Sequence, residues 1–252
     1  MKKSKIKKNN ILISQIKNFL FLILVSSFLP TSLLARNLGI KSLGHSSFLI
    51  TSADKSILIN PFKAIGCASN LKEPKEVNVD FILASSRLPD EGYNPNDQLM
   101  FVEPGIYQFE DILLNGISVP HDRVDGRRFG MATVWSWEQN DLKIVHMGGA
   151  AGDIDINSQI ILSSPDILFI SIGGGIKSYN GKEASKIVKL LKPNVVIPVH
   201  FERGKKINKE CDFSNADLFI ENMKDFKVKY VGKDFQIKPK RIDQNTIYIF
   251  SN

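Results

Sequence analysis

The order of short apolar segments along the chain constrains its fold more than any other feature of the sequence. Strand-length runs separated by turn signals come first, and the last third of the chain alternates strands with helices. Alternation of this kind indicates parallel strands with helices packed on the faces of a sheet. We therefore expect sheets stacked between helices, which is an α/β (α+β) architecture.

These segments are assigned to elements by their periodicity and composition. The predicted strands are 38–43, 47–51, 57–60, 79–84, 129–137, 142–146, 166–172 and 195–199, and the predicted helices are 182–191 and 215–226. Residues 129–137 and 142–146 flank a short polar segment, so we expect a hairpin. Trp135 and Trp137 share one face of its first strand and are expected in the core. No repeat or linker divides residues 36–252, whose length suits one domain.

The positive charge of the chain is concentrated at its N-terminus. Of the formal net charge of +7, six lysines in residues 1–35 supply +6, which leaves +1 for residues 36–252. The Lys-rich start is followed by an apolar run over residues 19–29, by Pro30 and by Ala35, which is the layout of an export signal. We expect either a signal peptide cleaved after Ala35 or an uncleaved membrane anchor.

This layout has consequences for location and partners. The protein is expected to be exported, to the periplasm or another extracytoplasmic space, or to be membrane-anchored by its N-terminal segment. Because the remaining chain is nearly neutral, we expect no nucleic-acid partner, and membrane contact only through an uncleaved N-terminal segment. In an oxidising compartment Cys67 and Cys211 either form a disulfide or remain two thiols, and the sequence leaves both alternatives open.

Seven short motifs occur in an order that resembles a known superfamily. They are Gly44-His-Ser-Ser-Phe-Leu-Ile50, Ile57-Leu-Ile-Asn-Pro61, Asp80-Phe-Ile-Leu-Ala84, Val119-Pro-His121, His146-Met-Gly148, Asp166-Ile-Leu-Phe-Ile-Ser-Ile-Gly-Gly174 and Val196-Ile-Pro-Val-His200. Together they resemble the metallo-β-lactamase fold, and in particular the metal-dependent hydrolases similar to ascorbate-6-phosphate lactonase. The resemblance implies an αββα four-layer sandwich with a site at the sheet edge, where two zinc, manganese or iron ions activate a water molecule.

The turn that carries most of the metal ligands in that superfamily has changed here. It reads Ser85-Ser-Arg-Leu-Pro-Asp-Glu91, where the superfamily has three histidines and one aspartate. In the register set by the preceding strand, Ser86 and Leu88 replace the first two histidines, Asp90 is kept, and Glu91 replaces the last histidine. A register shifted by one residue also loses both leading histidines.

The remaining positions leave the metal content open. His121 and His200 match the other histidine ligands, whereas the Gly-Asp pair that supplies a bridging carboxylate reads Gly148-Gly149. Asp90, Glu91 and His200 are still compatible with one divalent ion, Zn, Mn or Fe, that also carries water. The absence of any metal is equally compatible with this sequence.

Without metal ions, the leftover carboxylates need another cation, because unpaired buried charges are costly. Arg87, Arg123, Arg127 and Arg128 lie in neighbouring segments, and an arginine fork pairs well with a carboxylate. We therefore expect an arginine–carboxylate network to replace the metals. Arg87, Arg127 and Arg128 are also candidates for binding an anionic substrate.

Two functions are consistent with these substitutions. In the first, the protein is an atypical hydrolase of a small anionic ester or lactone, in which one metal held by Asp90, Glu91 and His200 activates water, and His121 or His45 assists proton transfer. In the second, the protein is catalytically inactive and holds a small anionic molecule in the former metal pocket.

Two weaker motifs do not change these hypotheses. The loop at 173–175 is Gly-Gly-Gly but lacks the Gly-Lys-Ser/Thr of a P-loop, so close backbone packing explains it. Ser85 and Ser86 invite a serine-hydrolase interpretation, but the chain has no Gly-x-Ser-x-Gly turn between a strand and a helix.

Overall fold

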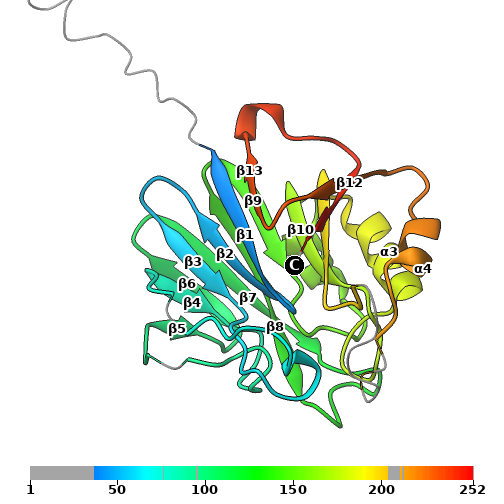
Figure 1. The fold of residues 1–252 in the computed structure, drawn as a ribbon, viewed down its shortest axis with the longest axis horizontal. Helices are drawn as coiled ribbons and strands as arrows, with labels where there is room; N and C mark the ends of the chain where they lie inside the picture. Colours follow the sequence, from blue (N-terminus) through cyan, green and yellow to red (C-terminus); the bar gives the residue numbers. More distant parts are fainter. Residues whose placement is uncertain (1–36, 76, 95, 204–210, 212, 252) are drawn as a thin grey trace, which may run out of the picture. The chain divides into compact units, whose positions relative to one another are not determined.

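The computed structural model describes residues 37–251 apart from 76, 95, 204–210 and 212, and shows two β-sheets packed face to face (Figure 1). The six-stranded sheet has the order β13 (Asp234–Ile237), β1 (Leu38–Gly44), β2 (Ser47–Thr51), β3 (Ser56–Ile59), β4 (Phe81–Leu83), β5 (Met100–Phe101). The eight-stranded sheet has the order β12 (Lys227–Val231), β14 (Thr246–Phe250), β11 (Val195–Val199), β10 (Ile167–Ser171), β9 (Leu142–His146), β8 (Met131–Gln139), β7 (Ile112–Pro120), β6 (Gly105–Phe109). The predictions for residues 1–35 lie outside the described residues.

The main hydrophobic core lies between the two sheets. Alternate residues of each strand point inward, as the period of two requires, and this places Phe48 of β2 against Phe169 of β10 with ring centroids 4.8 Å apart. Trp135 and Trp137 of β8 are buried in this core, as predicted. The Trp135 indole Nε1 donates a hydrogen bond to the carbonyl of Ala84 at 2.9 Å, so one core side chain links both sheets.

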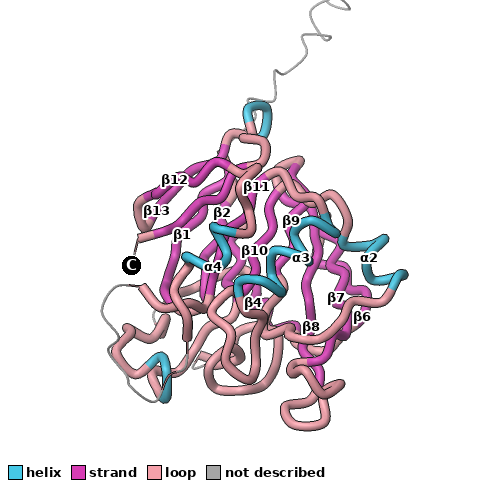
Figure 2. Tube along the Cα trace, turned by 90° about the vertical axis from the view of Figure 1, so that its right-hand side faces the viewer, coloured by secondary structure: helices cyan, strands magenta, loops and turns pink. Residues whose placement is uncertain are grey.

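The described α-helices all pack on the outer face of the eight-stranded sheet (Figure 2). They are α2 (Ile156–Leu162), α3 (Gly181–Leu191) and α4 (Asp217–Glu221). α3 begins with a capping box between Asn180 and Glu183 and buries its apolar face on β10 and β11. The predicted sandwich is confirmed. In the described residues, the outward side of β1 is flanked by the irregular segment 61–80, whose Leu71 packs beside Gly44.

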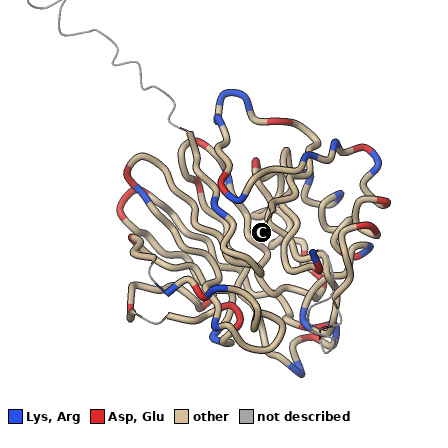
Figure 3. The backbone as a smooth tube through the Cα atoms, viewed as in Figure 1, with Lys and Arg blue, Asp and Glu red and all other residues tan. Residues whose placement is uncertain are grey.

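The predicted elements are found with small shifts of their ends. The hairpin joins β8 to β9, and β10 pairs with β11 in parallel. The predicted helix 215–226 is shorter in the structure: α4 spans Asp217–Glu221, and Ala216 before it provides no side-chain cap. In the view of Figure 3, basic and acidic residues are interspersed over the described domain. None of the described helices is long and apolar enough to cross a membrane.

The strand directions bring several strand ends to one edge of the sandwich. In the six-stranded sheet β1, β3 and β4 run in the same direction, and in the eight-stranded sheet β7, β9, β10 and β11 do so. Two backbone hydrogen bonds link the sheets at this edge, from Thr133 near the start of β8 to the carbonyl of Ser85 at 2.7 Å and from His200 to the carbonyl of His45 at 3.2 Å. Loops after strands from both sheets therefore meet there.

Candidate functional site

A cavity of about 420 Å³ opens at this edge, and we call it the outer cavity. Its polar lining consists of His45 after β1, Asp90 in the turn after β4, Lys177 in the glycine loop after β10, and His200 after β11. The same four residues also line a smaller space that continues to Glu91, His121 and Gly149, which we call the inner pocket. The structure thus brings together the candidate residues His45, Asp90, Glu91, His121 and His200.

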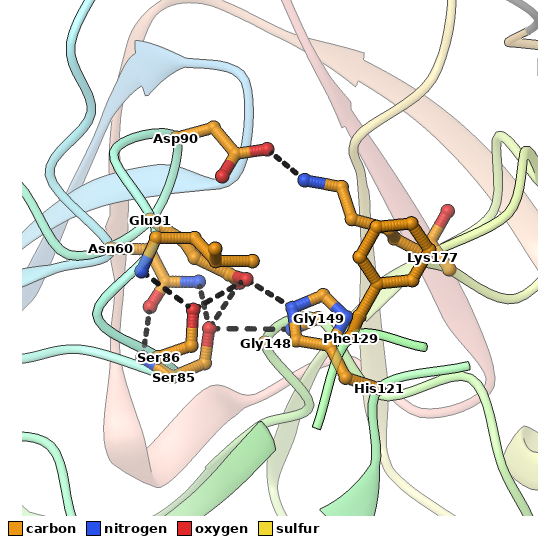
Figure 4. Close-up of polar contacts among 12 residues, drawn as sticks. Asn60, Ser85, Ser86, Asp90, Glu91, His121, Phe129, Gly148, Gly149 and Lys177 are labelled. Carbon is orange, nitrogen blue, oxygen red and sulfur yellow. Dashed lines mark hydrogen bonds and ion pairs between the residues drawn. The ribbon is translucent and has the colours of Figure 1, made fainter. Parts of the chain in front are cut away.

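A buried ion pair between Glu91 and His121 occupies the inner pocket (Figure 4). The side chains are 6% and 2% exposed, respectively, and the imidazole Nε2 contacts a carboxylate oxygen directly. Glu91 also accepts hydrogen bonds from the hydroxyls of Ser85 and Ser86, the latter at 2.9 Å. Two neighbouring serines of the turn therefore act as donors to this carboxylate.

This pairing fixes the charge of both partners. Burial alone would raise the pKa of Glu91, but the hydrogen bond and charge of His121, together with the two serine hydroxyls, outweigh it and lower the pKa to about 2. Burial likewise opposes the charge on His121, but its hydrogen bond to Glu91 and the carboxylate charge raise its pKa above the ordinary value. We conclude that the pair is a carboxylate and an imidazolium at pH values between about 4.5 and 6.5.

A second ion pair joins Asp90 to Lys177, whose ammonium group bonds to the Asp90 carboxylate. Both side chains are 25% exposed and border the outer cavity. The Lys177 ammonium also lies 5.9 Å from the centroid of the Phe129 ring. A lysine that follows the glycines at 173–175 therefore neutralises the Asp90 carboxylate of the turn.

His45 and His200 form the third part of the site. Their ring centroids lie 4.3 Å apart in an edge-to-face arrangement, and His200 also packs on Phe213 at 4.2 Å. Both have left-handed backbones, with φ of 54° and 52°, a conformation that costs energy outside glycine and is common at functional sites. Desolvation lowers the pKa of His45 to about 4, and desolvation with the nearby His45 lowers that of His200. Both imidazoles are therefore neutral at pH 7.

Gly149 provides the space for the inner ion pair. A Cβ atom at this position would lie 2.4 Å from the His121 ring and 2.7 Å from a Glu91 carboxylate oxygen, which is too close for any side chain. The resemblance places a metal-bridging aspartate at Gly149, so the direct Glu91–His121 contact and such an aspartate exclude each other. The Glu91–His121 ion pair therefore requires that position 149 carry no side chain.

The donor set does not fit a metal ion. Among the described residues, no three His, Cys, Asp or Glu side chains form a cluster that could hold one. Asp90 is bonded to Lys177, and Glu91 already accepts from three donors, so neither presents a free carboxylate to the space near His200. An ammonium group beside Asp90 would also repel a divalent cation.

The predicted arginine network is wrong. Arg87 pairs with Glu103 at the surface, and Arg123 pairs with Glu183 and with the carbonyls of Gly175 and Ser178. Arg127 bonds to a carbonyl of its own loop, and Arg128 lies over the Phe129 ring. None of these arginines lines the outer cavity or the inner pocket, where Lys177 and His121 are the cations. The candidates Arg87, Arg127 and Arg128 are therefore not among the residues that line either space.

The fourth histidine has a structural role. His146 is fully buried, accepts a hydrogen bond at Nδ1 from the amide of Gly148 at 3.1 Å, and meets the carbonyl of Ser46 through Nε2 at 3.2 Å. This fixes the tautomer with the proton on Nε2. Burial lowers the pKa of His146 to about 4, so it is a neutral link between the two sheets.

The two cysteines form a disulfide beside the outer cavity. Cys67 lies in a 3₁₀ turn (Gly66–Ala68) and Cys211 precedes α4; their Cα atoms are 5.6 Å apart, and their sequence separation is 144. Cys67 lines the cavity directly, and Phe213 lines it two residues after Cys211. Of the two alternatives left open by the sequence, the structure has the disulfide.

Sequence reasoning missed Lys177 among the residues of this site. The candidate cations considered were arginines near the turn and after His121, whereas Lys177 comes from a loop 87 positions after Asp90. A signal was present, because Lys177 comes two residues after the glycines at 173–175, which follow a predicted strand and belong to one of the motifs that carry the resemblance.

Comparisons with known proteins agree with this architecture. The family model of the beta-lactamase superfamily domain matches residues 39–200 of the chain. A metal-dependent hydrolase from Thermococcus onnurineus is 28% identical over 190 residues, which cover 64% of this chain and 84% of that protein. A metal-dependent hydrolase from Thermococcus kodakarensis is 28% identical over 191 residues, with the same coverage of both chains.

Solved structures share the fold at lower identity. One from Thermotoga maritima, assigned to the Zn-dependent hydrolases of the metallo-beta-lactamase superfamily, has a TM-score of 0.66 at 21% identity and covers 85% of this chain and all of that one. An isothiocyanate hydrolase from Delia radicum gut bacteria has a TM-score of 0.56 at 13% identity, covering 74% of this chain and 92% of that one. At these identities the likeness concerns the fold alone.

Proposed function

The chain belongs to the beta-lactamase superfamily, and from that membership and the paired carboxylates of its pocket we propose that it binds a small anionic molecule without a metal ion. The observation that carries the proposal is the ion pair of Asp90 with Lys177. A carboxylate at a metal-ligand position here has a protein cation as its partner, and an ammonium group donates up to three hydrogen bonds. Lys177 can therefore bond to Asp90 and to an anion in the outer cavity at once.

The surrounding groups support binding more than hydrolysis. Glu91 is held by His121, Ser85 and Ser86, so it is poorly placed to activate water as a general base, and its low pKa makes it a weak one. His45 and His200 are neutral and present ring nitrogens that can donate to an anionic oxygen. The arrangement holds an anion without supplying an activated nucleophile.

A hydrolase is the second candidate, because the Thermococcus relatives are named metal-dependent hydrolases. On this alternative, Lys177 moves away and Asp90, Glu91 and His200 hold one divalent ion, zinc, manganese or iron, which would polarise a substrate and a bound water. The substrate would be a small anionic ester or lactone. The ion pairs described above have to break first, which makes this the less favoured candidate.

Metal content and anion binding distinguish the two functions. The chain is expressed in medium supplemented with zinc, manganese and iron, and its metal is measured by mass spectrometry, with binding of phosphate, sulfate and acetate measured by calorimetry. We expect less than about 0.1 equivalent of each metal, and anion binding that Lys177→Met weakens at least tenfold while Lys63→Met, the matched surface control, leaves it unchanged. One equivalent of metal that is lost in an Asp90→Ala/His200→Ala double variant would establish the hydrolase site instead.

A further inference from the structure

The outer cavity is polar at one end and apolar along its walls. The polar end is formed by His45, Asp90, Lys177 and His200, whereas the walls are formed by Ile65, Ala68, Leu88, Pro89, Ile176 and Phe213. Ile65 and Ile176 are 45% and 47% exposed, so both present apolar surface to solvent at the cavity. Ligand sites commonly combine apolar walls with a few polar groups that orient the ligand.

From this division we propose that the ligand is an amphipathic anion, with its charged group at Lys177 and an apolar body of several carbon atoms along the cavity walls. The inference rests on the proposed function, because it assumes that the anion lies at Lys177, and it adds the chemical class of the molecule. A purely polar anion would leave the isoleucine and phenylalanine side chains in contact with water. An apolar body attached to the anion would cover them and release that water.

The size of the cavity bounds the length of the apolar body. At roughly 30 Å³ per methylene-sized group, which is the volume of one water molecule in the liquid, about 420 Å³ holds on the order of ten such groups. Some of that space is taken by the charged group and by hydrating water. We therefore expect apolar bodies of up to about eight carbon atoms to fit.

A disulfide joins the two segments that form the apolar walls of the outer cavity. The Cys67–Cys211 disulfide links the segment that carries Ile65 and Ala68 to the segment that carries Phe213. The two cysteines have a sequence separation of 144. The Phe213 ring in turn packs edge-to-face on His200, which joins this wall to the polar end of the cavity. The wall and the anion site are thus held in one fixed relation, as recognition of a two-part ligand requires.

A series of straight-chain alkyl sulfonates tests the proposal, because the sulfonate group stays ionised at every pH used. Binding of methane- to decanesulfonate to the full chain is measured by calorimetry below the micelle concentration. Each buried methylene is expected to raise the affinity about fourfold, up to about eight carbons, after which the gain stops. The neutral 1-octanol is expected to bind at least tenfold more weakly than octanesulfonate.

Two variants test whether the increase in affinity per methylene comes from contact with the cavity wall. Ile65→Ser is expected to reduce the gain per methylene, whereas Ile106→Ser, which changes an isoleucine that is 75% exposed on β6, leaves the whole series unchanged. Both positions are at the surface, so folding, checked by circular dichroism, is expected to be unaffected in either variant.

The outcomes separate this inference from the proposed function. If methanesulfonate binds but longer chains bind no more tightly, the ligand is a purely polar anion, which overturns the inference and leaves the proposed function standing. If no sulfonate binds, or if 1-octanol binds as tightly as octanesulfonate, the anion site itself is refuted, and both proposals fail. An unchanged chain-length gain in Ile65→Ser also overturns the inference, because the apolar body then lies elsewhere.

Discussion

Replacing Glu91 by glutamine tests the central ion pair of the site. Glutamine has almost the same shape but no charge, so Glu91→Gln removes the partner of the His121 imidazolium without leaving a large cavity. It also offers one oxygen acceptor in place of two to the Ser85, Ser86 and His121 donors. The expected result is a marked loss of folding stability, because a buried charge and at least one buried donor lose their partner.

The size of the loss follows from the pKa of Glu91. The fold lowers this pKa from the ordinary 4.5 to about 2, and since one pKa unit corresponds to about 1.4 kcal/mol, the fold favours the carboxylate by about 3 kcal/mol. The same interaction raises the pKa of His121, so the two partners report one free energy that is counted once. We therefore expect Glu91→Gln to lower the free energy of unfolding by about 3 kcal/mol near pH 6.

Urea unfolding of the oxidised protein, followed by tryptophan fluorescence, measures this loss. Trp135 and Trp137 are both buried in the core and report on unfolding of both sheets. The matched control is Glu103→Gln, which removes the same charge from an ion pair with Arg87 whose side chains are 65% and 69% exposed. That control is expected to change the free energy of unfolding by less than about 1 kcal/mol, as exposed pairs contribute little.

The pH dependence gives the prediction a specific signature. The contribution of Glu91 is fully present above its unfolded pKa of 4.5 and is lost as the pH falls toward about 2. The contribution of His121 is present below 6.5 and is lost as the pH rises through its raised folded pKa. The difference between wild type and Glu91→Gln is thus expected to be largest between about pH 5 and 6.5 and to shrink to less than half by pH 3.

Two results would refute this reasoning. One is a loss below about 1 kcal/mol at pH 6, which would mean that Glu91 is not held as a charged partner of His121. The other is a loss that stays constant from pH 6 to pH 3, which would point to packing and not to charge as its cause.

Three further predictions concern the surroundings of the site. Gly149→Ala places a Cβ atom 2.4 Å from the His121 ring and is expected to destabilise the fold by about 1–3 kcal/mol in the same urea assay; an unchanged midpoint would contradict the described contact. Reduction of Cys67–Cys211 is expected to cost about 2–5 kcal/mol, measured as urea unfolding with and without dithiothreitol, and equal curves would mean that the bond adds nothing. Asp122 accepts four backbone N–H bonds from the loop that follows it, so Asp122→Ala is expected to speed tryptic cleavage in that loop severalfold, and an equal cleavage rate would show that other contacts hold it.

The sequence was sufficient for the framework of the site because strand ends are governed by local patterns. Apolar runs and turn signals predicted where β1 and β11 end, and therefore where His45 and His200 stand. The parallel pairing of β10 with β11 followed from the alternation of strands and helices. These features depend on residues close together in the chain.

The pairing of charges within the site could not be predicted in the same way. Whether Asp90 meets an arginine or Lys177 depends on the paths of loops that are distant in sequence, and several cations compete for it. Arg123 pairs outside the pocket with Glu183, whose carboxylate also accepts the capping hydrogen bond from Asn180 at the start of α3. The sequence pattern predicted that Asp90 and Glu91 lie in the pocket, but it did not predict which cations pair with them.

The disulfide has a consequence for the order in which the protein matures. Its two cysteines have a sequence separation of 144, so the bond closes only after the chain up to Cys211 has been synthesised and the two segments have been brought together. A newly made chain in reducing surroundings would carry Lys177 and the histidines, but the two halves of its apolar wall would not be joined. If the ligand is the proposed amphipathic anion, its affinity is expected to be higher for the oxidised protein than for the reduced protein.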